Sequence, residues 1–132
     1  MTVHAQALVV PWQVEYGNGT HTGIADTSKS GVGGQGGLRP HELLESALAT
    51  CMAITARLWL AERDLDDTGL VVSVDVVREE TSTRFQYALR LPRALESHRA
   101  ELLAVLETCP VRRTLSKPIT FAATAQGSLE VP

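Results

Sequence analysis

The sequence contains only two cysteines, Cys51 and Cys109, among its 132 residues. Aromatic residues make up 5% of the chain, and the arginines are scattered, so no run of basic residues is present. With a net charge of −3, the chain lacks the basic stripe that tracks a phosphate backbone, so we expect no nucleic-acid partner. No stretch reaches the roughly 18 apolar residues of a membrane span, so we expect no membrane partner either.

The first fifteen residues contain no lysine or arginine, and the apolar run 7–10 ends at Pro11. A secretory signal has a basic start and a longer apolar region, so the pattern predicts a cytoplasmic protein. In that reducing compartment a lasting structural disulfide is disfavoured. A cysteine pair there is more often catalytic, redox-active or metal-binding.

Length and composition predict one globular domain over residues 1–132, with 44% hydrophobic and 20% charged residues. Alternating β-formers indicate two or three antiparallel strands within residues 3–28, with a hairpin turn at Asn18-Gly19. The expected parts are N-terminal strands and a Gly-rich loop (1–37), a central helix (38–63), a hairpin (70–91), and helices with a closing strand at 119–126 (92–132). This order is typical of an α+β fold with antiparallel sheets.

The strongest helical signal begins at Pro40 and runs to about Arg63. One stripe at helical spacing comprises Leu44, Leu48, Cys51, Thr55 and Leu58. The middle of this segment is almost free of charge, which predicts a helix buried on nearly all sides. Its expected length of about 36 Å exceeds the radius of gyration of about 14 Å for such a domain. The helix should therefore cross the whole molecule or reach a partner subunit.

Three familiar motifs are incomplete. Residues 31–36 match the letters of a dinucleotide-binding glycine motif, but they follow a polar segment instead of a buried strand. The segment from His41 to Glu45 has a glutamate where a zinc protease needs its second histidine. Cys-x-x-Cys is absent as well. We therefore expect no cofactor and no metal site.

The two cysteines differ in their sequence surroundings. Cys51 can be read as a small hydrophobic residue of a core helix, because free cysteine is among the most buried residue types. Cys109 precedes Pro110, which suits the first position of a helix, so Cys109 is expected at the N-cap. The positive end of that helix, with Arg112 and Arg113, would favour a thiolate at Cys109.

The segment Gly36-Gly37-Leu38-Arg39-Pro40-His41-Glu42-Leu43-Leu44, then Ala47-Leu48-Ala49-Thr50-Cys51, resembles the OsmC/Ohr family of bacterial hydroperoxide-stress proteins. Thr108-Cys109-Pro110-Val111 is similar to the second motif of that family. The resemblance implies antiparallel sheets wrapped around a long central helix. It also implies an intertwined homodimer with its active sites at the subunit interface.

The same resemblance implies a thiol peroxidase. Cys51 would attack an organic hydroperoxide and become a sulfenic acid, and Cys109 would condense with it to a disulfide. A dithiol reductant, such as a lipoyl group or a low-molecular-weight thiol, would then reduce the disulfide. The alternative is a stress-associated dimer or small-molecule-binding protein whose cysteines are packed and do not turn over.

The chain departs from the peroxidase branch of the family around the reactive cysteine. That branch has an arginine in the N-terminal segment and a glutamate directly after the proline. Here His41 follows Pro40, Glu42 comes one place later, and no arginine precedes Arg39. Arg39, His41 and Glu42 are therefore the candidates for binding substrate or tuning the thiolate, with Arg57 or an arginine of a partner subunit as further sources of the cation.

Overall fold

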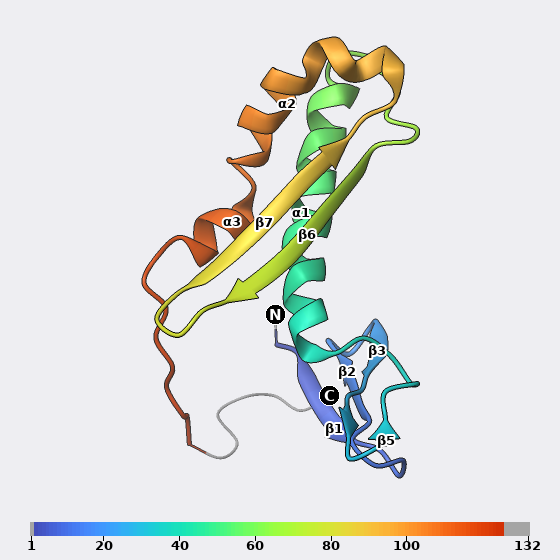
Figure 1. Ribbon diagram of the computed structural model, residues 1–132, viewed down its shortest axis with the longest axis vertical. Helices are drawn as coiled ribbons and strands as arrows, with labels where there is room; N and C mark the ends of the chain where they lie inside the picture. The colour runs from blue at the N-terminus through green and yellow to red at the C-terminus, as the bar shows by residue number, and fades with distance from the viewer. Residues whose placement is uncertain (1, 126–132) are drawn as a thin grey trace. The chain divides into compact units, whose positions relative to one another are not determined.

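The computed structural model describes residues 2–125 and divides the chain into two compact units. Within the described residues, the first comprises 2–43 with 120–125, and the second comprises 44–119. Figure 1 shows the helices and strands of both units. The elements are helices and antiparallel strand pairs, as expected for an α+β fold.

The first unit contains a three-stranded antiparallel sheet of β1 (His4–Ala7), β2 (Val14–Gly17) and β3 (Thr22–Ala25), in the order β1-β2-β3. The turn between β2 and β3 is organised by Asn18. Its side-chain oxygen accepts hydrogen bonds from the backbone N–H groups of Thr20 and His21, at 3.0 and 2.9 Å. An Asx turn of this kind suits asparagine, and the predicted hairpin is confirmed.

The glycine-rich segment is more ordered than the sequence predicts. Ser28–Lys29 (β4) pairs with Val32–Gly33 (β5) in a short antiparallel hairpin. The buried carboxylate of Asp26 accepts hydrogen bonds from the backbone of Gly36 (2.9 Å) and Thr27 (2.7 Å) and from Gln13 Nε2 (3.3 Å). The Gly36 hydrogen bond is the main cause that lowers the pKa of Asp26. A buried anion satisfied by backbone donors thus shapes this segment.

Helix α1 spans Pro40–Ala61 and is about 33 Å long at ~1.5 Å per residue. At its start the Glu42 carboxylate accepts a hydrogen bond from the Arg39 N–H, at 2.9 Å. This contact is the N3-to-N-cap half of a capping box. The helix ends two residues earlier than predicted, because Asp64 adopts a left-handed φ of 54° and the Leu65 N–H bonds back to the Leu60 carbonyl.

The second unit pairs β6 (Val71–Arg78) with β7 (Thr83–Arg90) in a long hairpin, drawn as the two long arrows of Figure 1. A 3-10 turn (Arg93–His98) leads into α2 (Arg99–Leu106), and α3 (Pro110–Leu115) follows. One face of the hairpin packs against the core, through Val72, Val74, Phe85, Tyr87 and Leu89. The predicted hairpin is confirmed.

The core of this unit is apolar and draws on α1, β7, α2 and the segments between them. Its buried members are Leu48, Met52, Ala56, Leu60, Leu89, Leu91, Leu95, Leu102, Leu106 and Cys109. The predicted burial of α1 on nearly all sides is therefore wrong for this chain, because Leu44 and Leu58 of the predicted stripe are exposed. A helix that is apolar nearly all round gives no periodic signal for which face meets the core.

The predicted closing strand does not form within the described residues. Residues 118–125 belong to no helix or strand, and Gln126 lies outside the described part. A β-prone segment becomes a strand only when a neighbouring strand pairs with its N–H and C=O groups. The sheets of the described chain provide no such pairing.

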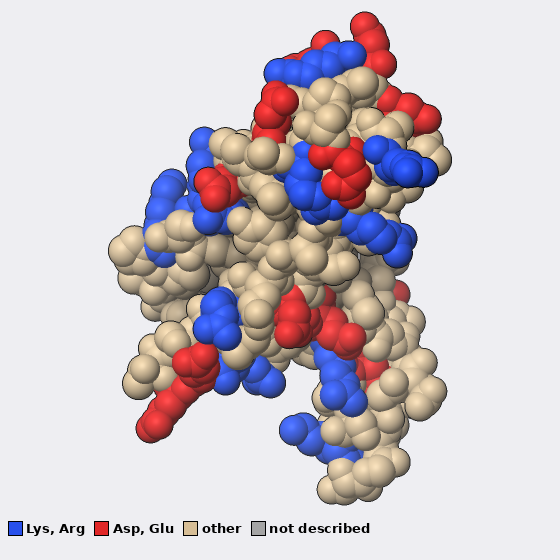
Figure 2. Space-filling view, turned by 45° about the horizontal axis from the view of Figure 1, so that its top comes forward, with Lys and Arg blue, Asp and Glu red and all other residues tan. Residues whose placement is uncertain are grey.

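Helix α1 meets the length and composition of a membrane span, with a mean hydropathy of 1.3. No such segment was predicted from the sequence. The same test is passed by core helices of soluble proteins, and four residues of α1 lie in the core of the second unit. On the face seen in Figure 2, basic and acidic side chains are interspersed.

Candidate active site

Cys109 lies at the N-cap of α3, as predicted. Its backbone is extended (φ −62°, ψ 138°), Pro110 occupies the first helical position, and the sulfur accepts a hydrogen bond from the Arg112 N–H at 3.3 Å. The side chain is fully buried, with 0% of its surface exposed. The local sequence therefore sets the helix start, while tertiary packing removes the sulfur from water.

Cys51 lies in the middle of α1 and is half-buried. Its sulfur accepts a hydrogen bond from the Val111 N–H at 3.5 Å. Consecutive N–H groups of α3 thus contact the two sulfurs, with Val111 on Cys51 and Arg112 on Cys109. Two thiols that are 58 positions apart in the sequence meet at one short helix, and both are free.

The electrostatic setting of Cys109 differs from the prediction. Burial raises the pKa of the Cys109 thiol, and the hydrogen bond and charge of Cys51 raise it further. The N–H groups of Arg112 and Val111 act in the opposite direction but do not prevail. The helix start therefore does not lower the pKa of Cys109 as predicted, because desolvation outweighs the hydrogen bonds that it provides.

Arg39, His41 and Glu42, the three predicted tuning residues, belong to the first unit, whereas both cysteines belong to the second. Arg39 precedes α1, and His41 and Glu42 occupy its exposed first turn. Glu42 has a structural role there, since it accepts the Arg39 N–H. A role for these residues at the thiolate stays a prediction.

A cavity of about 170 Å³ lies among α1, β7 and α3. Its lining residues are Leu48, Phe85, Tyr87, Arg112, Leu115 and Ser116, the residue that follows α3. It adjoins the residues that hold the cysteines, because Arg112 contacts Cys109 and Leu48 lies one helical turn before Cys51. This cavity was not predicted from the sequence. The alternation of β7 places Phe85 and Tyr87 on one face, but it does not show which helices cover that face.

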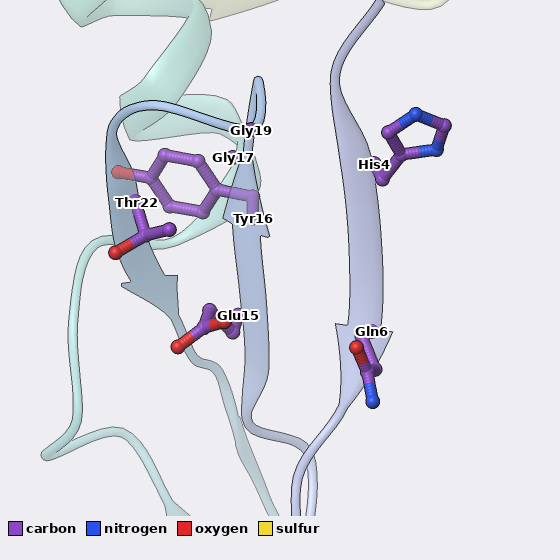
Figure 3. A pocket seen from close by; sticks show the side chains of 7 residues that line it. All are labelled: His4, Gln6, Glu15, Tyr16, Gly17, Gly19 and Thr22. Carbon is purple, nitrogen blue, oxygen red and sulfur yellow. The ribbon is translucent and has the colours of Figure 1, made fainter. Parts of the chain in front are cut away.

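A second cavity, of about 210 Å³, lies on the sheet of the first unit (Figure 3). Among its lining residues, His4 and Gln6 come from β1, Glu15 and Tyr16 from β2, and Thr22 from β3. No cysteine lines this cavity. Over residues 2–125 there is no group of three or more His, Cys, Asp or Glu side chains that could hold a metal ion. The cysteine pair is thus the candidate active site.

Comparison with solved structures supports the fold. An osmotic-stress and detoxification-response protein, as it is described, from Psychrobacter arcticus 273-4 superposes with a TM-score of 0.70 at 18% identity, over 86% of this chain and 87% of that one. An OsmC-like protein from Mycoplasma pneumoniae gives 0.65 at 19% identity, over 86% and 85%. The organic hydroperoxide resistance protein OhrB of Bacillus subtilis gives 0.53 at 18% identity, over 87% and 89%.

No curated protein sequence matches the chain significantly. The family model described as OsmC-like protein matches residues 33–124. The match covers most of the chain and includes both cysteines, the central helix and the β6–β7 hairpin. The chain therefore belongs to the OsmC-like protein family.

Proposed function

We propose that this protein is a thiol-dependent peroxidase that reduces organic hydroperoxides through Cys51 and Cys109. The observation that carries the proposal is the meeting of the two sulfurs at the first turn of α3. The family resemblance supports the reaction class, since OhrB of Bacillus subtilis is an organic hydroperoxide resistance protein.

In the proposed reaction the Cys51 thiolate attacks the terminal oxygen of the hydroperoxide. An S–O bond forms, the O–O bond breaks, and the alkoxide takes up a proton and leaves as an alcohol. The Cys109 thiol then condenses with the Cys51 sulfenic acid, giving a disulfide and water. One dithiol such as a lipoyl group, or two molecules of a low-molecular-weight thiol, returns two electrons and two protons and is oxidised to a disulfide.

The unequal settings of the two cysteines support these roles. Cys51 is half-buried and so accessible to a small molecule, whereas Cys109 is fully buried and its pKa is raised. A nucleophile must be reached by substrate and ionised, while a resolving thiol needs only to be close to the sulfenic acid. The Val111 N–H provides one polar donor to the Cys51 sulfur.

We further propose that the protein acts as a homodimer in the cytoplasm. The outer face of α1 in the second unit exposes Leu44 (46%), Ile54 (57%) and Leu58 (62%). Together with Ala47 and Cys51 they follow a heptad spacing, which suits packing against another helix. Ile54→Asp should convert the dimer to monomer in sedimentation, whereas Glu62→Gln at the exposed helix end should not. An unchanged sedimentation coefficient in I54D contradicts this dimer.

The peroxidase proposal is tested with Cys51→Ser, using cumene hydroperoxide and a dithiol. We expect its turnover to fall to background, because a hydroxyl is far less acidic than a thiol. Cys109→Ser should still form one sulfenic acid per chain, detected by dimedone labelling and mass spectrometry, but no intramolecular disulfide. Wild-type turnover in C51S would falsify the proposal.

The alternative, a binding or stress-associated dimer with packed cysteines, is favoured by the complete burial of Cys109. Titration of free thiols separates the two functions. One equivalent of hydroperoxide should consume two thiols per chain in the peroxidase and none in the binding protein.

A further inference from the structure

We propose that the cavity beside the cysteines selects short organic hydroperoxides that carry an anionic group, and that Arg112 pairs with that group. This inference rests on the proposed peroxidase function and defines a preference among its substrates. It makes Arg112 a specificity-determining residue.

The position of Arg112 is tied to the reactive sulfurs through its backbone. Its N–H contacts the Cys109 sulfur at 3.3 Å, and the preceding residue, Val111, contacts the Cys51 sulfur at 3.5 Å. The same Arg112 lines the cavity of about 170 Å³. A molecule in this cavity therefore lies beside the residues that hold both thiols.

The walls of the cavity are largely apolar and aromatic, formed by Leu48, Phe85, Tyr87 and Leu115. Cavities for drug-sized ligands measure roughly 300–1,000 Å³, so a volume of about 170 Å³ suits a short or single-ring molecule. A long acyl chain would not be enclosed. The apolar part of the substrate is therefore small.

The positive charge of Arg112 is the feature of the cavity that would bind an anionic group of the substrate. Its Nη1 donates a hydrogen bond to the Glu107 carbonyl at 3.2 Å, which leaves other N–H donors of the guanidinium for a ligand. The ion pairs between residues 2 and 125 involve other basic side chains, and no carboxylate there pairs with Arg112. The Ser116 hydroxyl donates to the Arg112 carbonyl at 2.7 Å, so its hydrogen is already used.

Arg112 is half-buried and lines this largely apolar cavity. A cation in such a setting attracts an anion more strongly than a fully exposed one, because water screens it less. A carboxylate can also accept two parallel N–H bonds from arginine. The chemistry therefore selects a molecule with a small apolar body, a hydroperoxide for Cys51 and a carboxylate for Arg112.

The test compares cumene hydroperoxide with 4-(2-hydroperoxypropan-2-yl)benzoate, which differs from it by one carboxylate. In wild type the kcat/KM of the benzoate should exceed that of cumene hydroperoxide. In Arg112→Gln the ratio of the two kcat/KM values should fall about tenfold, the effect of one charge-assisted hydrogen bond. Arg113→Gln, at the exposed neighbouring arginine, should keep the wild-type ratio.

A binding measurement separates this inference from the peroxidase proposal. The unreactive alcohol 4-(2-hydroxypropan-2-yl)benzoate should bind wild type and R113Q alike in calorimetry, and R112Q about tenfold more weakly. Binding that depends on Arg112 without any peroxide turnover would refute the peroxidase and keep the anion site. Turnover of cumene hydroperoxide, with an R112Q ratio and affinity equal to wild type, would overturn the anion site alone.

Discussion

The two compact units are stabilised in different ways. In the second, ten buried apolar residues from helices and hairpin form one core. In the first, the buried residues among those described are Ala25 and the charged Asp26, and Val3, Val9, Val10 and Trp12 are exposed. The second unit thus depends on apolar burial, while the first depends on backbone pairing between strands and on hydrogen bonds to the Asp26 carboxylate.

The two cysteines belong to the unit that has the apolar core. A rigid apolar core holds side chains in defined rotamers, and both cysteines are attached to the elements of that core. The first unit contributes a sheet and a hydrogen-bonded glycine-rich segment, and its described residues form no such apolar core. The candidate chemistry accordingly lies in the unit with the better core.

The largest effect is expected for Leu102→Ala in the core of the second unit. Leu102 is fully buried, and truncating such a leucine costs about 2–5 kcal/mol of unfolding free energy. The neighbouring Leu103 is 37% exposed, so Leu103→Ala should lose much less. Denaturant unfolding of the reduced proteins at one concentration measures both. Equal losses would contradict a core that depends on apolar burial.

An intermediate effect is expected for Asp26→Asn in the first unit. The asparagine side chain keeps one acceptor oxygen, but its NH₂ group would face backbone N–H groups, which are also donors. We therefore expect the Tm to fall by roughly 5–10 °C. Glu15→Gln, at an exposed carboxylate of the same unit, is the control. If D26N melts with wild type, the carboxylate does not hold this unit together.

Acid should act through the same residue. The pKa of Asp26 is lowered in the folded protein, so its contribution to stability is present above the unfolded pKa of about 3.9. It is lost as the pH falls through the folded pKa. D26N should therefore lose less stability than wild type on acidification below about pH 4. A D26N acid profile parallel to that of wild type argues against this linkage.

The smallest effect is expected in alkali, at Cys109 in the second unit. The pKa of Cys109 is raised in the folded protein. The contribution of this thiol to the unfolding free energy is therefore fully present below the unfolded pKa of about 8.5. The contribution decreases as the pH rises through the folded pKa. The unfolding free energy of the reduced protein should therefore decline above about pH 8.5, and Cys109→Ala should show a smaller decline. Identical slopes would remove Cys109 as the cause.

Much of the local structure could be predicted from the sequence. Asn18 marked its hairpin turn, Pro40 the start of α1, and the Cys109-Pro110 pair the start of α3. Each is a preference of the backbone that acts over a few residues. The closing strand was predicted from the same kind of pattern and is absent from residues 119–125, because strand formation needs a partner that the pattern does not specify.

The sequence predicted which cysteines form the candidate site but not the cavity beside them. The motifs singled out Cys51 and Cys109, and the structure brings their sulfurs to consecutive N–H groups of one helix. The cavity lined by Phe85, Tyr87 and Arg112 was not predicted, since it is formed where three elements meet.

The sequence by itself determined the central helix, the β2–β3 and β6–β7 hairpins and which two residues carry the thiols. Only the tertiary structure decided which face of α1 is buried, why the pKa of Cys109 is raised, and which residues lie beside the two cysteines. Backbone preferences act between near neighbours in the chain, whereas desolvation depends on every atom that packs around a group. That is why the pKa of Cys109 is raised although the residue lies at a helix N-terminus, a position that by itself favours a thiolate.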